Sequence, residues 1–247
     1  MDKALYVAMT GAAQTMRAQA ANNHNLANVS TVGFRAELVT DKPTPVPGDG
    51  LGSRVNASLQ DVGWDASGGG LMPTGRDLDV ALRGNTWLAV QASDGSEAYT
   101  RAGDLTVTAQ GQVINGAGHA VLGEGGPLSV PPNSSVSISG DGTVSIVPLG
   151  QSASTLATVG RLKLVDATPA QLSRGADGLM RARSGVSLLP ASGNVVISGS
   201  LESSNVNLAE AMTNMISLAR QFELQTKMMK TVEDNATASA SLVRIGG

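Results

Sequence analysis

The stretch NLAEAMTNMISLARQFELQTKMMKTVEDNATASASLV, residues 207–243, is the longest helical pattern in the chain. Apolar or small residues recur every seven positions, and a second series lies three positions further on, as in one seam of a coiled coil. No glycine or proline interrupts the pattern before Gly246, which predicts a helix of about 36 residues and roughly 54 Å. The helix-packing positions in this stretch are Leu208, Met215, Leu218, Phe222, Gln225, Met229, Val232 and Val243.

The start of this helix carries a capping pattern. Asn207 is placed to accept a hydrogen bond from a free amide of the first turn, and Glu210 stands where a capping box has its acidic residue. Further along, the seam holds Gln225 and small residues where a self-sufficient core would have leucine. A helix this long and this incompletely apolar depends on packing against other helices, in this chain or in other molecules.

A second helical pattern occupies the first 30 residues. Its heptad positions are Leu5, Met9, Ala12, Met16, Asn23 and Leu26, with Gln19 completing the seam. We predict that the two terminal helices pair as a coiled coil, and that the cluster of Asn, Ser, Thr and Gly after Leu26 ends the first one. His24 stands alone near this turn, where a surface or hydrogen-bonding role is expected in preference to metal binding.

The segment between the helices changes its period. From Arg76 to Leu201 apolar residues alternate with polar ones in about ten short strands separated by glycines, and Asp94-Gly95 has the pattern of a hairpin turn. This predicts an antiparallel sandwich or irregular barrel. The expected fold is therefore mixed and mainly β, divided into 1–35 (N-terminal helix and turn), 36–66 (extended Pro/Gly connector, ending near a glycine hinge at 68–70), 67–201 (inserted antiparallel β domain) and 202–247 (C-terminal helix, pairing with 1–35).

The composition excludes several classes of function. The chain has 247 residues, no cysteine, two histidines and a formal net charge of −3. Disulfides, thiolate metal sites and cysteine nucleophiles are therefore excluded, and the charge gives no basis for binding nucleic acid. No run of 18 apolar residues is present, so direct membrane insertion is not expected, and the N-terminus lacks the pattern of a secretory signal.

We find no set of residues that predicts catalysis. Asp77 and Asp79 form a pair that might hold a cation, but no third carboxylate is near, and solubility at a strand edge explains them better. Two isolated histidines give no nucleophile and base pair. The expectation is no catalytic, cofactor-binding or metal residues, no cofactor, and a protein that is not an enzyme.

Three motifs together resemble the bacterial flagellar rod and hook proteins. They are the Asn25-to-Asn28 and Thr31-to-Arg35 segments, the Leu78-to-Gly84 and Tyr99-to-Gly103 segments, and the Leu201-to-Asn207 segment, in the family's order from end to end of the chain. One departure is Val32, where many relatives have proline. Residues carried over as family signature are Asn25, Leu26, Ala27, Asn28, Gly33, Phe34, Leu201, Glu202, Ser204, Asn205 and Val206.

The resemblance implies a function. The opening Met1-to-Tyr6 segment and the Arg220-to-Met229 run are similar to the family's proximal-rod members, which implies a structural subunit of the rod that crosses the periplasm between the motor and the distal rod and hook. Its implied partners are other rod proteins and the flagellar type III export apparatus, which would export it as a monomer without a cleaved signal. The alternatives are a distal-rod or hook protein of the same family, or a β-rich surface adhesin with a coiled-coil anchor.

Overall fold

The computed structural model describes residues 3–45, 55–151 and 155–245, and the chain divides into two compact units. The first, here called the helical unit, comprises Met1–Val29, Ala36–Asp65 and Val206–Gly247. The second, the β unit, comprises Ser30–Arg35 and Ala66–Asn205. The β unit is thus inserted between the two terminal helices, and the fold is mainly β with antiparallel sheets, as the sequence predicts.

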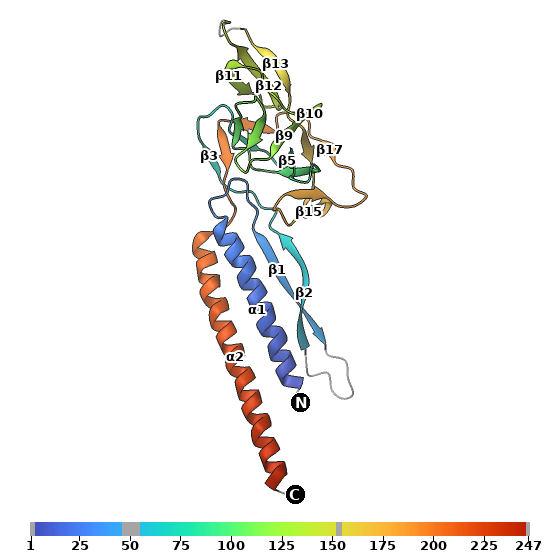
Figure 1. Ribbon diagram of the computed structural model, residues 1–247, viewed down its shortest axis with the longest axis vertical. Helices are drawn as coiled ribbons and strands as arrows, with labels where there is room; N and C mark the ends of the chain where they lie inside the picture. The colour runs from blue at the N-terminus through green and yellow to red at the C-terminus, as the bar shows by residue number, and fades with distance from the viewer. Residues whose placement is uncertain (1–2, 46–54, 152–154, 246–247) are drawn as a thin grey trace. The chain divides into compact units, whose positions relative to one another are not determined.

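The helical unit contains two helices and one hairpin. Helix α1 spans Lys3–Ala27 and helix α2 spans Leu208–Ile245. Strands β1 (Glu37–Pro45) and β2 (Val55–Trp64) pair antiparallel, from Glu37 opposite Trp64 to Pro45 opposite Val55. Within this unit α1 contacts α2 and also contacts the hairpin (Figure 1). Two different elements therefore cover α1.

The described parts of the predicted connector, which the prolines and glycines suggest to be extended or loosely ordered, are extended strands. Glu37–Pro45 and Val55–Trp64 pair as the β1–β2 hairpin, which belongs to the helical unit. Pro43 and Pro45 are accommodated in β1 because this sheet has only two strands, so each strand has a free edge where a missing N–H costs no ladder hydrogen bond. In the described residues, the prolines are therefore compatible with a paired, extended strand.

The start of α2 follows the predicted cap. The Asn207 side-chain oxygen accepts hydrogen bonds from the backbone amides of Ala209 at 3.0 Å and Glu210 at 3.3 Å. These are two of the four amides that have no partner inside the helix. The helix then runs for 38 residues.

The β unit is built from short strands. In chain order they are β3 Leu71–Pro73, β4 Val80–Leu82, β5 Thr86–Gln91, β6 Glu97–Thr100, β7 Leu105–Val107, β8 Val113–Asn115, β9 Ala120–Gly123, β10 Gly126–Pro127, β11 Asn133–Ile138, β12 Thr143–Pro148, β13 Ala157–Arg161, β14 Leu164–Asp166, β15 Leu172–Arg174, β16 Met180–Ala182, β17 Leu189–Pro190, β18 Val196–Ser198 and β19 Ser200–Glu202, with a short 3-10 helix η1 at Pro169–Gln171.

These strands form one large sheet and three small ones. The large sheet has the order β15-β16-β6-β5-β9-β8-β7, with β10 beside β9, β14 beside β5 and β17 beside β14. The others are β11-β12-β13, β18-β4 and β19-β3. Leu88 and Val121 of the large sheet and Val144 and Ile146 of the three-stranded sheet belong to one apolar cluster, so the two sheets share a core.

The predicted strands correspond to observed ones, with one correction. Asp94-Gly95 is the β5–β6 turn, where Gly95 has φ +82° and the Asp94 carboxylate accepts from the Ser96 amide at 2.9 Å. The stretch 160–165, which reads as one short strand in the sequence, is divided between β13 and β14, which lie in different sheets. A short apolar run cannot reveal such a change of sheet, because both halves alternate in the same way.

Gly103 is packed directly against the backbone of β4 in the β unit. A Cβ atom there would lie 1.9 Å from the Val80 carbonyl oxygen. We expect Gly103→Ala to destabilise the β unit by about 3 kcal/mol, because the backbone must move to remove the overlap. Gly125 has no atom within 4 Å of its added Cβ, so Gly125→Ala should leave stability unchanged. Urea unfolding followed by tryptophan fluorescence compares the two, and equal midpoints would contradict the packing argument.

Candidate functional site

The face of α2 that the sequence identifies is the less exposed face of this helix. Met215, Leu218, Phe222, Gln225, Met229 and Val232 are half-buried, and Ala211 is buried. Of the residues between them, Thr226 is also half-buried and the others are exposed, as is Leu208, and the side chain of Val243 lies outside those that the structure describes. The seven-residue spacing therefore marks the side of α2 that contacts α1.

The opposing face of α1 consists of small and polar residues. The Asn22 side-chain amide donates to the Ala211 carbonyl at 2.8 Å, and the Gln225 amide donates to the Thr15 hydroxyl at 3.4 Å. Ala8 and Thr15 are buried, and Gly11 lies directly beneath Gln225. Small side chains allow two helices to approach closely, so this face of α1 contacts α2 without large apolar groups.

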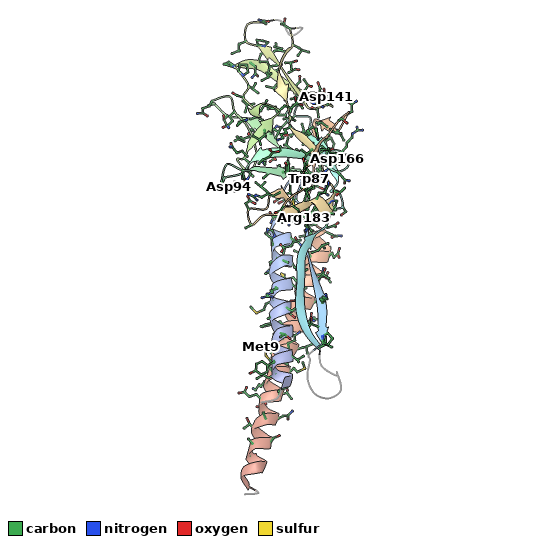
Figure 2. The ribbon with its side chains drawn as sticks, turned by 90° about the vertical axis from the view of Figure 1, so that its right-hand side faces the viewer. Met9, Trp87, Asp94, Asp141, Asp166 and Arg183 are labelled. Carbon is green, nitrogen blue, oxygen red and sulfur yellow. The ribbon has the colours of Figure 1, made fainter. Side chains whose placement is uncertain are left out.

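The large residues expected at the α1 seam are instead exposed. Met9, which is labelled in Figure 2, is 53% exposed. Leu5 is 37% exposed and Met16 57%, and Asn23 is exposed as well. Of the other predicted α1 positions, Ala12 is buried, and Gln19 and Leu26 are half-buried. We call Leu5, Met9, Met16 and Asn23 the outer stripe. They lie away from the face of α1 that contacts α2, where the side chains are small or polar.

The third face of α1 contacts the hairpin. Asn25 donates to the Glu37 carbonyl at 2.9 Å and accepts from the Glu37 amide at 2.7 Å, so one side chain replaces a strand partner at the start of β1. His24 lies 3.0 Å from the Glu37 carboxylate, which fits the hydrogen-bonding role expected of it. Helix α1 thus presents three faces, of which only the outer stripe lacks a partner element within the described residues.

Helix α2 continues past the end of α1. It has 38 residues and α1 has 25, and the Asn22–Ala211 and Thr15–Gln225 contacts align the two antiparallel. All residues from 233 to 241 are exposed. The additional turns amount to about 20 Å of helix, and Figures 1 and 2 both show them beyond the N-terminal end of α1.

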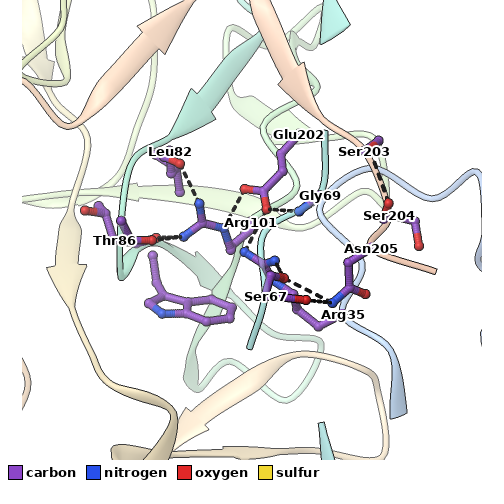
Figure 3. Close-up of polar contacts among 12 residues, drawn as sticks. Arg35, Ser67, Gly69, Leu82, Thr86, Arg101, Glu202, Ser203, Ser204 and Asn205 are labelled. Carbon is purple, nitrogen blue, oxygen red and sulfur yellow. Dashed lines mark hydrogen bonds and ion pairs between the residues drawn. The ribbon is translucent and has the colours of Figure 1, made fainter. Parts of the chain in front are cut away.

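The β unit contains a buried cluster of charges centred on Glu202. Its carboxylate lies 2.7 Å from Arg35 and 2.6 Å from Arg101, and all three side chains are at most 4% exposed (Figure 3). The Gly69 amide donates to the same carboxylate at 3.0 Å. Donors in this number offset the loss of water around a buried carboxylate.

Arg101 has further partners that offset its burial. Its guanidinium donates to the carbonyls of Gly84 at 2.9 Å and Thr86 at 2.8 Å, and also to that of Leu82. Its carbon CZ lies 5.7 Å from the centroid of the Trp87 ring, within the range of a cation–π contact. One side chain therefore joins the loop between β4 and β5 to the C-terminal strand β19.

The signature residues meet at this cluster. Gly33 has φ +66°, donates its amide to the Glu202 carbonyl at 2.8 Å, and lies so close to Arg101 that an added Cβ would be 2.3 Å from its backbone carbon. Phe34 lies 4.8 Å beneath the Arg174 guanidinium, and Asn205 donates to Ser67 at 3.0 Å. Leu201 is buried in β19. Three segments distant in sequence thus converge on one carboxylate.

The remaining signature residues have local roles. Asn28 donates to the His24 carbonyl at 2.8 Å just beyond α1, and the Ser204 carbonyl accepts from Ser203 at 3.1 Å. Ala27 is the exposed last residue of α1, and Val206 is half-buried.

Sequence reasoning quoted Arg35 and Arg101 in motifs without giving them a role, because a single arginine has no periodic signal. Among the glycines at 68–70, where a hinge is expected, Gly69 is closely packed, since a Cβ there would lie 1.9 Å from the Ser203 carbonyl oxygen. Close backbone packing explains this glycine.

The candidate cation pair is not at a solvated strand edge. Asp77 is exposed, but Asp79 is 1% exposed, pairs across a bridge with Asp104, and lies 3.5 Å from Arg76. Burial beside an arginine replaces the solubility explanation for Asp79. Across the residues that the structure describes, no group of three His, Cys, Asp or Glu side chains is placed to hold a metal. In the same residues, no helix combines the length and apolar character needed to cross a membrane.

Comparison with known proteins gives matches along nearly the whole chain. Residues 81–146 match the family described as flagellar hook protein FlgE/F/G D1 domain, and residues 197–242 match flagellar basal body rod FlgEFG protein C-terminal. Flagellar basal-body rod protein FlgF of Escherichia coli K12 is 45% identical over 249 residues, covering 98% of this chain and 99% of that protein.

Two further relatives show how far the similarity extends. FlgF of Salmonella typhimurium LT2 is 45% identical, covering 95% of this chain and 96% of its own length. Flagellar basal-body rod protein FlgG of Bacillus subtilis 168 is 29% identical, and the match covers 95% of this chain and 96% of that protein. The matched segments include Arg101 and Glu202, two members of the buried charge cluster.

Glu202→Gln tests the charge cluster. The amide keeps the shape but removes the charge that compensates two buried arginines, so we expect a loss of about 3–5 kcal/mol in β-unit stability. Glu124→Gln is the matched control, because Glu124 forms an exposed pair with Arg161 at 3.6 Å, and it should change stability by less than about 0.5 kcal/mol. The denaturant midpoints of both variants measure this difference in stability. A Glu202→Gln protein as stable as the control would show that the charge cluster is dispensable for stability.

Proposed function

As a member of the flagellar basal-body rod family, this chain is a structural subunit of the rod, and we propose that its helical unit is the part that joins it to neighbouring subunits. The observation that carries the function is the 45% identity to two FlgF proteins over nearly the full length of each chain. The family and relative names describe structural proteins, and we propose that this chain likewise has no enzymatic activity.

The position in the rod is part of the proposal. We place the subunit in the proximal rod, the section of the periplasm-crossing drive shaft below the distal rod and hook. Support comes from the FlgF relatives and from the Arg220-to-Met229 run. Its partners would be proximal and distal rod proteins, and the FlgG relatives are consistent with a common mode of packing in the rod. A distal-rod or hook position is the alternative within the family.

The mode of assembly follows from the three faces of α1. One face contacts α2 and one contacts the hairpin, which leaves the outer stripe to pack against helices of other subunits. In the same way, the turns of α2 beyond α1 offer a second surface to neighbours. We propose that α1 and α2 of one chain pair as a short antiparallel coiled coil, and that neighbouring pairs pack through these surfaces.

The route to the rod is also proposed. The chain would be exported without a cleaved signal by the flagellar type III apparatus and would remain a monomer until it reaches the growing rod. We further propose that 1–35 and 202–247 form the inner, axial part of the subunit and that 67–201 forms its outer part.

Met16→Asp tests the outer stripe. Met16 is 57% exposed in the chain, so a carboxylate there should leave helix content and stability unchanged, but an unpaired charge in a subunit interface costs several kcal/mol. We expect cells with this variant to be non-motile with normal protein levels. Leu189→Asp is the control, because Leu189 is 73% exposed in the β unit, and this strain should swim. Swimming of the Met16→Asp strain would remove the outer stripe from the proposal.

A further inference from the structure

Gln225 is the one amide on the α2 face that contacts α1, and its surroundings are unusual. Its Nε2 donates to the Thr15 hydroxyl at 3.4 Å, and Thr15 in turn donates to the Gly11 carbonyl at 3.0 Å. Its Oε1 is buried and has no hydrogen-bond partner among the described residues. A buried hydrogen-bond acceptor without a partner destabilises the contact between two helices. The presence of glutamine at this position therefore requires an explanation.

Gly11 supplies the space that this amide occupies. A Cβ at position 11 would lie 2.8 Å from Oε1, 3.0 Å from Nε2 and 3.1 Å from the amide carbon of Gln225. Gly11 is also the only glycine in α1, and α2 has none. A glycine in the middle of a helix weakens it relative to alanine, so its position beneath the glutamine has a packing explanation that helix propensity does not give.

Other alignments of the two helices do not offer this space. Sliding α1 by one heptad in either direction, about 10 Å, brings Ala4 or Ala18 to the place of Gly11. Each alanine carries the Cβ that would overlap the amide. In the alignment that brings Ala4 there, Ala8 replaces Thr15, so the glutamine also loses its hydrogen-bond acceptor. Only the observed alignment gives Gln225 both room and an acceptor.

We propose that Gln225, Gly11 and Thr15 form a register lock that selects one axial alignment of α1 on α2. The rest of the contact between α1 and α2 distinguishes poorly between alternative alignments, because α1 contributes small residues that fit in several of them. The alignment also sets how far α2 extends past α1. That consequence for assembly rests on the proposed function, whereas the lock itself is a property of the single chain.

Disulfide formation in the full-length protein measures the alignment. Because the native chain has no cysteine, an introduced pair is the only disulfide that can form. Asn22→Cys with Ala211→Cys reports the observed alignment, and Ala8→Cys with Leu218→Cys reports the shift of one heptad that brings Ala4 to the place of Gly11. In an otherwise native chain the first pair should oxidise and the second should lag behind.

The lock predicts how variants change this preference. Gln225→Ala and Gly11→Ala should each raise oxidation of the shifted pair relative to the native pair by about fivefold, the ratio that one ordinary hydrogen bond gives. The double variant should match either single variant, because both remove the same contact. Gln221→Ala, on the exposed face of α2, and Ala13→Gly, on the exposed face of α1, are matched controls and should change nothing.

Two results would overturn the register lock. One is an unchanged preference in Gln225→Ala and Gly11→Ala chains whose helix content by circular dichroism is native. The other is an otherwise native chain that oxidises both cysteine pairs equally. Motility of cells carrying the Gln225→Ala and Gly11→Ala variants is scored separately. If these variants change the disulfide preference as predicted but the cells swim normally, the register lock stands and only its consequence for assembly is rejected.

Discussion

The Glu202 carboxylate between Arg35 and Arg101 is the interaction on which the rest of the β unit depends. Each arginine belongs to a different part of the chain: Arg35 follows α1, and Arg101 lies in the loop after β6. Glu202 ends β19, six residues before α2 begins. One buried anion therefore holds the segment that leaves α1, the centre of the β unit and the segment that enters α2.

Such a cluster contributes more to specificity than to net stability. Removing three charges from water costs about as much as their attraction returns, so replacement by apolar residues of the same shape can be neutral. The geometry of the cluster, however, restricts how these segments can pack. Arg101 also donates to three backbone carbonyls, and only glycine fits against the neighbouring backbone at positions 33 and 69. Alternative packings of these segments would leave a buried charge without a partner.

Much of this architecture follows from local chemistry that a sequence displays. The Asn207 cap, the Asp94-Gly95 turn and the alternation of strands such as β5 are determined by neighbours within a few residues, and each is present where the sequence predicts it. The less exposed face of α2 is equally predictable from the sequence, because Met215, Phe222 and Met229 are large apolar residues at a regular spacing.

The features that sequence reasoning missed depend on contacts between distant segments. The outer stripe of α1 has a stronger apolar signal than the face that contacts α2, because close helix packing favours alanine and glycine over methionine. The hairpin at 37–64 is hidden by prolines that a two-stranded sheet tolerates. Arg35, Arg101 and Glu202 are single charged residues far apart in the chain, and only the fold brings them to one point.

The division of the helical unit into three chain segments has a consequence for the order of folding. Its last component, residues 206–247, follows the other two in the chain and is synthesised after them. The β unit ends at Asn205, so it can fold before α2 is present to pair with α1. Contacts as distant in sequence as Asn22 with Ala211 form late and slowly. The helical unit is therefore completed last, after the β unit has formed.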